Sequence, residues 1–208
     1  MLSRRPICHL ARSRDGAALV EFAFVLPVLL IIFIGGYVVA DMIACSRKVT
    51  VATRALSDLV GRNVSPSTTV TSATLTTYMN SAQLVMTPMS AALTTLQISN
   101  LRVCDATHAY VVWSQAQTNG ATVASSLTVG SVVSIPANLI TTPMVPTSPD
   151  GSNVCQNTTS GANKVVVGTA GGYIFLGQIS FSYTPPIGLG TLTSIKLSDQ
   201  DYMIPRLP

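Results

Sequence analysis

The stretch FAFVLPVLLIIFIGGYVVA, residues 22–40, decides how the rest of this chain can be organised. It has no charged residue, and its nineteen residues match the roughly 20 that an α-helix needs to cross a hydrocarbon core about 30 Å thick. A buried helix of a globular protein seldom lacks polar residues over so many turns, because one side usually meets water. The sequence therefore predicts a transmembrane helix.

The residues around this stretch leave its processing and orientation open. Val38-Val39-Ala40 has the small-x-small form of a secretory cleavage exit, although the apolar run is longer than the 7–15 residues of an ordinary signal peptide. Lys and Arg set membrane orientation by their imbalance, and here they balance. Four precede the span and four follow it: Arg4, Arg5, Arg12 and Arg14, then Arg47, Lys48, Arg54 and Arg62. Both an uncleaved anchor and cleavage near Ala40 are compatible with these flanks.

Charge is scarce along the whole chain and is concentrated before residue 63. Charged residues make up only 10% of the 208 residues, against about a quarter in an ordinary globular protein. A hydrophobic fraction of 48% excludes a wholly disordered chain. The formal net charge is +4, but the basic residues after position 62 are scattered singly, so the sequence does not predict nucleic-acid binding. These residues are Arg102, Lys164, Lys196 and Arg206.

One acidic residue conflicts with its apolar surroundings. Glu21 lies within AALVEFAFVLP, residues 17–27, and a carboxylate at the bilayer centre costs about 2.5–3.5 kcal/mol on insertion scales. In one interpretation Glu21 lies at the headgroup level, in the first turn of the helix, where the macrodipole favours an anion. In the other interpretation it pairs with a positive charge.

The segment before Glu21 resembles a type IV prepilin cleavage site. Arg14-Asp15-Gly16 ends a basic leader, and Glu21 is the fifth residue after Gly16. In that family a prepilin peptidase cuts after the Gly on the cytoplasmic side of the membrane, so the resemblance implies cleavage between Gly16 and Ala17. The new α-amine, with an ordinary pKa of about 8, would then meet Glu21 of a neighbouring subunit and set the register of assembly. Gly16 also suits a scissile position, because a residue without Cβ leaves an extended backbone open to the protease.

A wider block is similar to the TadE/TadG-like proteins of the tight-adherence (Tad, or Flp) pilus system. The family pattern Gly-Ala-Ala-x-Val-Glu-Phe-Ala-x-Val-Leu-Pro falls on Gly16 to Pro27, and a basic stretch leading to Asp-Leu-Val falls on Arg47 to Val60. The resemblance implies a minor pilin, or pseudopilin, because the major pilins of this system are very short chains. Ala17 stands where many type IV pilins have Phe, so N-methylation is left open. Weaker similarities follow at Val111-Val112-Trp113, Tyr183-Thr184-Pro185 and Pro205-Arg206.

The N-terminal helix is expected to continue beyond the membrane, from Ala17 to Arg62. An apolar stripe at helical spacing predicts the seat of the soluble domain, with packing on a partner helix as the alternative. Charged residues four apart predict a solvated face beside it. The stripe consists of Val49, Ala52, Leu56, Leu59 and Val60, and the charged face of Arg54, Asp58 and Arg62.

The remaining chain predicts an α+β fold, a short helix followed by an antiparallel sheet. The helix is expected over residues 73–86, and period-2 alternation with turn residues between the runs indicates strands. The expected strands are Leu96–Val103, Ala109–Ser114, Leu127–Ile135, Lys164–Thr169 and Tyr173–Tyr183, with a loop over Pro143–Gly161. Three parts result: a leader over residues 1–16, the helix over 17–62 and an exported domain over 63–208.

Two cysteines of the exported part suggest a disulfide. Cys104 ends a predicted strand and Cys155 lies in the longest predicted loop. In an oxidising compartment a bridge closing so long a loop stabilises a domain by about 2–4 kcal/mol; two unrelated thiols are the alternative. Cys8 lies in the leader and Cys45 near the membrane edge, and neither has an evident partner.

Few residues of the exported part are suited to catalysis. Asp105 and His108 suggest a metal pair or a proton relay, but a turn between strands explains both. Asp199 and Asp201 fit a solvated C-terminal loop better than a cation site. We therefore expect no catalytic residue, metal or cofactor, and a protein that is not an enzyme.

Together these patterns predict a structural component of pilus assembly. We expect it to cross the bacterial inner membrane once, with its N-terminus cytoplasmic and its domain periplasmic, and to stay there or enter the pilus. The expected partners are a prepilin peptidase, other Tad/Flp pilus subunits, the inner-membrane assembly platform and membrane lipid. The alternative is an unprocessed, signal-anchored periplasmic adaptor or binding protein.

Overall fold

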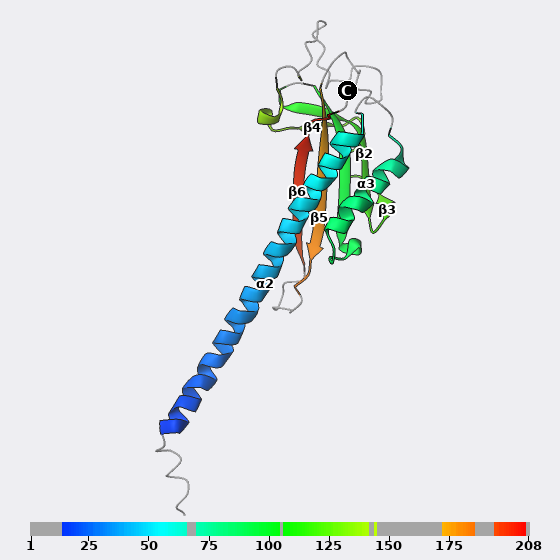
Figure 1. Ribbon diagram of the computed structural model, residues 1–208. Helices are drawn as coiled ribbons and strands as arrows, with labels where there is room; N and C mark the ends of the chain where they lie inside the picture. The colour runs from blue at the N-terminus through cyan, green and yellow to red at the C-terminus, as the bar shows by residue number, and fades with distance from the viewer. Residues whose placement is uncertain are drawn as a thin grey trace, which may run out of the picture. The chain divides into compact units, whose positions relative to one another are not determined.

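The computed structural model describes residues 14–65, 70–104, 106–141, 144, 172–185 and 194–206 (Figure 1). The chain divides into two compact units, Met1–Ile43 with Pro185–Thr193, and Ala44–Thr184 with Ser194–Pro208. A long apolar N-terminal helix, a short helix and an antiparallel sheet are all present, which confirms the predicted α+β class. The predictions that concern Cys8, Asp105, Cys155 and the strand Lys164–Thr169 fall on residues outside the described ranges.

Helix α2 spans Arg14–Asn63, close to the predicted limits. Pro27 lies inside it, as membrane-spanning helices tolerate. The last turn is closed by Asn63, whose Nδ2 donates to the Leu59 carbonyl at 2.7 Å, and by Val64, whose N–H donates to the Val60 carbonyl at 2.9 Å. These bonds satisfy carbonyls that a helix end otherwise leaves without partners.

The part of α2 within the second unit buries one side only. Val49, Ala52, Leu56 and Val60 are each at most 1% exposed, so the apolar stripe is the seat of the soluble domain, as predicted. Leu59 is half-buried. On the charged face Arg54 is exposed, and Asp58 accepts from Arg62 at 2.9 Å and lies 3.6 Å from Arg206.

The sheet of the second unit has the strand order β3-β2-β1-β5-β6, with β4 paired to β2, and all described pairs are antiparallel. Its register shifts between Asn100 and Leu101, where β1 meets β2. The strands are β1 Thr94–Val103, β2 His108–Thr118, β3 Ala121–Val123, β4 Val132–Ser134, β5 Tyr173–Tyr183 and β6 Ile195–Met203. Helix α3, Ser72–Val85, and the short 3₁₀ turns η1, Ala91–Leu93, and η2, Ala137–Leu139, complete the described elements.

Most of the predicted elements are confirmed, and two need correction. Helix α3 and strands β1, β2 and β5 lie where they were expected. The strand predicted over Leu127–Ile135 is reduced to β4, because residues 126–130 form bends and a turn. The C-terminal loop expected around Asp199 and Asp201 is wrong: both residues belong to β6, which pairs with β5 along its whole length.

Helix α2 lies close against the sheet where Ser57 of the helix meets Gly177 of β5. A Cβ atom on Gly177 of β5 would collide with Ser57 Oγ, and one on Gly61 would lie 2.7 Å from Met203 Cγ in β6. Ser57 Oγ donates to the Asp201 carbonyl at 3.4 Å, and the Arg206 N–H donates to the Gly61 carbonyl at 2.9 Å. The helix backbone therefore approaches β5 and β6 as closely as side chains without bulk allow.

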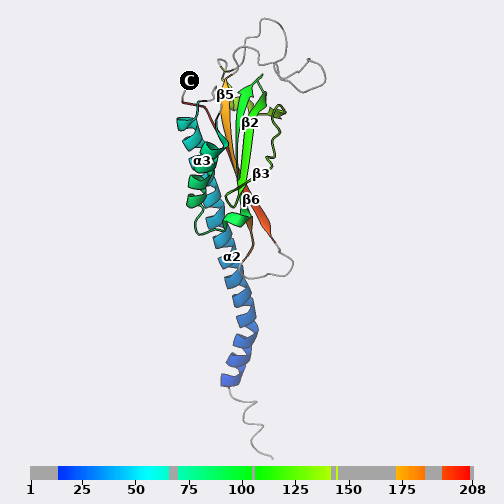
Figure 2. The same ribbon diagram turned by 90° about the vertical axis from the view of Figure 1, so that its right-hand side faces the viewer.

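Helix α3 covers the same face of the sheet (Figure 2). Gln115 of β2 donates to the Ser72 carbonyl at 3.2 Å and to Thr76 Oγ1 at 3.1 Å. Gln115 pairs with Ile98, which pairs with Gly177, and residues directly opposite in a sheet point to the same side. Both helices thus pack on the side to which Gly177 belongs.

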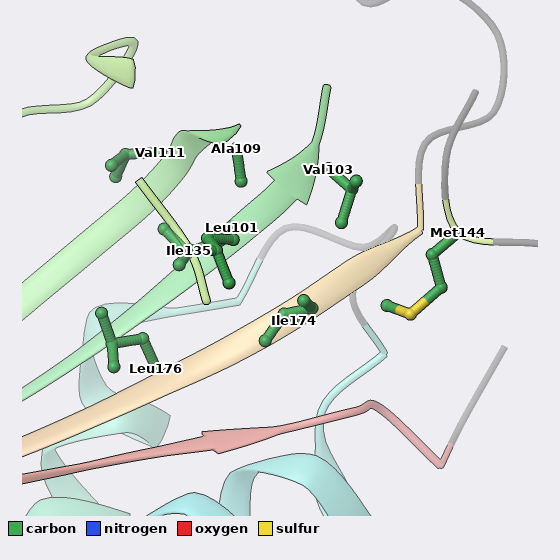
Figure 3. Close-up of a cluster of buried hydrophobic side chains, with 8 residues drawn as sticks. All are labelled: Leu101, Val103, Ala109, Val111, Ile135, Met144, Ile174 and Leu176. Carbon is green, nitrogen blue, oxygen red and sulfur yellow. The ribbon is translucent and has the colours of Figure 1, made fainter. Parts of the chain in front are cut away.

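The opposite face is apolar at one end, where a cluster of hydrophobic side chains is buried (Figure 3). The segment that follows β3 supplies Ile135 and Met144 to it, with Leu127 and Leu139 packed at its margin. This segment therefore acts as the cover of that end of the face. The cluster consists of Leu101, Val103, Ala109, Val111, Ile135, Met144, Ile174 and Leu176.

We predict that Gly177→Ala lowers the free energy of unfolding by about 1–3 kcal/mol, because the added methyl group overpacks the contact with Ser57. The measurement is denaturant unfolding of the full chain in detergent, followed by the fluorescence of Trp113, which contacts the Phe175 ring at 5.9 Å between centroids. Adding Ser57→Gly should recover part of the loss. Gly36→Ala is the control, since a Cβ there meets nothing within 4 Å. Equal stability of Gly177→Ala and the unchanged protein would contradict the close approach.

Candidate functional site

The N-terminal part of α2 presents apolar side chains in every direction. Residues 18–33 are all exposed, with Phe24 and Phe33 at 76% and 74%. Ala18–Asn63 is a helix long and apolar enough to cross a membrane, and only 6% of its most apolar window is buried within the protein. A core helix would bury that surface against other elements, whereas lipid accepts it on all sides. This helix therefore suggests single-pass membrane anchoring.

Gly16 lies in the first turn of α2 and is exposed. The backbone at Gly16 is helical in the free chain, because α2 begins two residues upstream at Arg14. Ala and Leu, which follow Gly16, are among the best helix formers. The N–H groups of a first turn have no helical partner, so this turn opens at little cost.

Glu21 is exposed within the apolar surface. Since α2 begins at Arg14, Glu21 lies two turns inside the helix and not in its first turn, as the headgroup interpretation supposed. The macrodipole acts within the first turn, so it stabilises this carboxylate little while residues 14–16 remain attached. Ala17 and Glu21 are four residues apart and therefore lie on one face of the helix.

Cys104 ends β1 and is buried. It is disulfide-bonded, whereas Cys45 is buried and is not part of a disulfide. Because these are the two cysteines within the described ranges, the partner of Cys104 lies outside them, and its pairing with Cys155 stays a prediction.

Two tyrosines and an arginine lie beside Cys104. Tyr110 belongs to the same small buried cluster as Cys104, and the Arg102 guanidinium lies 5.1 Å from the centre of the Tyr173 ring. Burial raises the pKa of the Tyr110 phenol above its ordinary value, although Arg102 acts in the opposite direction. The phenol is therefore neutral at physiological pH, and the described residues form a packed end of the sheet.

Of the acidic and histidine residues considered from the sequence, the structure describes His108, Asp199 and Asp201, which lie on two different strands. His108 begins β2, and its Nδ1 lies 3.0 Å from Thr107 Oγ1. Asp199 and Asp201 lie opposite Ile179 and Gly177 on β5. In the part of the chain that the structure describes, no three His, Cys, Asp or Glu residues are grouped in a way that could hold a metal ion.

Three glutamines form a row across the sheet that the sequence does not predict. Gln97, Gln178 and Gln200 lie directly opposite one another on β1, β5 and β6. Alternation within each strand is visible in the sequence, but the pairing register that brings the three together is not.

Residues 16–55 match the family model of the TadE-like proteins. The match begins at Gly16, contains Glu21 and the apolar stretch 22–40, and reaches into the buried part of α2. The resemblance to the TadE-like proteins is therefore confirmed over this segment. No curated protein and no solved structure matches the chain.

Proposed function

We propose that this chain is a minor pilin or pseudopilin that takes part in assembly of a Tad/Flp-type pilus. The observation that carries the proposal is the coincidence of three features in one segment. The TadE-like match starts at Gly16, the helix that follows is apolar on all sides, and Glu21 is the one acidic residue within its first turns after Gly16. A TadE-like segment indicates involvement in the Tad pilus system, and a carboxylate on such a helix requires a positive partner in lipid.

The proposed location is the bacterial inner membrane, crossed once by α2, with the N-terminus cytoplasmic and the sheet domain periplasmic. Its partners there are the prepilin peptidase, the other Tad/Flp pilus subunits and the inner-membrane assembly platform. Lipid is the partner of the apolar surface over residues 18–33, because the described part of the protein leaves that surface exposed. The role is structural, and no enzymatic step is assigned to the chain.

The proposed processing step is cleavage of the peptide bond between Gly16 and Ala17. It removes the basic leader and leaves an α-ammonium on Ala17, at the start of an apolar helix. It also makes Glu21 the fifth residue of the shortened helix, so that the carboxylate moves toward the positive end of the macrodipole. Trimming therefore supplies both a partner charge and a more favourable field.

The partner of the amine is proposed to be Glu21 of a neighbouring subunit. Within one chain the two groups are also close, since four residues rise about 6 Å along a helix, and this internal pair competes with the intersubunit pair. A lengthwise stagger of neighbouring helices favours the latter. In a low dielectric an unpaired charge is costly, so the pair selects one register of packing.

An unprocessed, signal-anchored adaptor or binding protein is the alternative function. It shares the exposed apolar helix but has no use for Gly16 or for a carboxylate at position 21. Cleavage of the leader therefore distinguishes the minor pilin from the unprocessed adaptor.

Of the three predictions that follow from the proposed function, the first concerns the mass of the mature chain. On co-expression with a matching prepilin peptidase, we expect the intact mass to correspond to loss of residues 1–16, with an inactive peptidase as control. The full-length mass in the presence of active peptidase would favour the adaptor. A cut near Ala40 would instead indicate a secretory signal and a released domain.

The second prediction concerns Glu21. Glu21→Ala should leave trimming intact but reduce the number of pili at least tenfold, because removal of one member of a buried pair costs about 3–5 kcal/mol. Glu21→Asp, which keeps the charge, serves as the matched control and should retain more assembly. Pili counted by electron microscopy at normal numbers with Glu21→Ala would rule out the pairing role.

The third prediction concerns the cysteines. We propose that Cys104 pairs with Cys155, and expect that either Cys→Ser variant lowers the free energy of unfolding by about 2–4 kcal/mol. The double variant should lose no more than each single one, since both remove the same bond. Cys45→Ala provides the control because Cys45 is not part of a disulfide. If Cys155→Ser leaves Cys104 inaccessible to alkylation under non-reducing, denaturing conditions, the pairing is wrong.

A further inference from the structure

A polar groove of about 530 Å³ lies on the sheet face opposite the helices, beside the apolar end already described. Its volume falls within the range of small-molecule sites. Strands β1, β5 and β6 form its floor and outer edge, and Ala124 and Ser126, which follow β3, form the inner wall. The lining residues are Thr95, Gln97, Ala124, Ser126, Gln178, Ile179, Ser180, Lys196, Ser198, Asp199 and Gln200.

The glutamine row runs across this groove as a chain of hydrogen bonds. Gln97 Nε2 donates to Gln178 Oε1 at 3.0 Å, and Gln178 Nε2 donates to Gln200 Oε1 at 3.5 Å. Gln200 is exposed on β6, so its amide nitrogen ends the row where solvent can reach it. The row therefore presents amide donors and acceptors in a fixed order across three strands.

The inner end of the row is held in place before any ligand arrives. Gln97 is 5% exposed, and its Oε1 accepts from both the N–H and the Oγ of Ser126 at 2.9 Å. Its Nε2 also lies 3.4 Å from Ser99 Oγ. A side chain with all these bonds loses little rotamer freedom on binding, which is the condition for a preorganised site.

The chemistry of the lining selects an uncharged, hydroxyl-rich ligand. Amides and hydroxyls each offer donors and acceptors, and the lining includes one cation and one anion, Lys196 and Asp199, which leaves no net charge to attract an ion. Asp199 Oδ1 is already bonded to the Gln200 N–H at 3.0 Å. We propose that this groove binds a neutral saccharide made of hexopyranose units.

The spacing of the row favours a saccharide over an extended peptide. Neighbouring strands lie about 4.8 Å apart, and the row advances by one glutamine per strand. A hexopyranose unit is about as long as this spacing, so two successive rings can face the amides of Gln178 and Gln200, while Gln97 holds Gln178 in place. In an extended peptide, side chains on one face are about 6.8 Å apart, because they alternate along the chain. This distance does not match the roughly 4.8 Å spacing of the glutamines.

This inference does not depend on leader processing or on pilus assembly. The groove lies wholly within the second unit, so a chain that is never trimmed should bind equally well. Failure of saccharide binding and failure of the trimming prediction are separate results.

The experiment uses the full chain in a detergent without a sugar headgroup, with cellohexaose, chitohexaose and laminarihexaose as probes in saturation-transfer NMR titrations. We expect at least one probe to bind, with an affinity that does not change between low and high salt. Gln178→Leu and Gln200→Leu should each weaken binding at least tenfold. The matched control Gln115→Leu, on the opposite face of the sheet, should change it less than twofold.

Gln200→Leu decides the test if Gln178→Leu does not fold, because Gln200 is exposed and at the sheet edge. No binding of any probe to the folded chain overturns the proposal. So does binding that both groove variants leave unchanged. A Gly-Ser peptide that binds with sensitivity to these variants, where the saccharides do not, overturns it in favour of a peptide groove.

Discussion

The contact between Ser57 of α2 and Gly177 of β5 determines how the second unit packs. Thr53, Ser57 and Gly61 recur every fourth residue and form a strip of small side chains on α2, which follows the i, i+4 direction of a helix face. The buried hydroxyl of Thr53 donates to the Val49 carbonyl of its own helix at 2.8 Å, so it needs no partner from the sheet. A glycine inside a strand destabilises it, because glycine loses more conformational entropy on folding than other residues. At Gly177 this loss is offset by packing, because the backbone of α2 can lie against β5.

One helix meets two different surroundings, and its sequence changes accordingly. Over residues 18–33 apolar side chains point in all directions and none is buried within the protein. From Val49 to Val60 the burial follows the helical period, and charged residues such as Asp58 occupy the other side. A 3.6-residue pattern arises only where a helix has one wet and one dry side. The loss of that pattern toward the N-terminus is therefore itself evidence for lipid.

The sequence predicts the helices and strands that have a local signal. It does not predict those that form only because a neighbouring strand pairs with them. The long helix, α3 and β5 follow from periodicity and composition over consecutive residues. The sequence predicts a loop in place of β6, because Ser-Asp-Gln-Asp, residues 198–201, is polar throughout. It is a strand because it is at the sheet edge among the described strands, where one partner supplies the hydrogen bonds and polar side chains keep the edge soluble.

The same distinction separates Glu21 from the glutamine row. Glu21 can be identified from the sequence alone, because its carboxylate lies among apolar residues within one helical turn on either side. Gln97 and Gln178 are 81 residues apart, and Gln178 and Gln200 are 22 apart. The position of Gln178 depends on Gly177, the residue before it, because successive residues of a strand point to opposite faces. The register that places Gly177 against Ser57 turns Gln178 to the other face, between Gln97 and Gln200. A slip of one residue would turn every side chain of β5 over. The packing of α2 and the floor of the groove are thus fixed by a single choice of register.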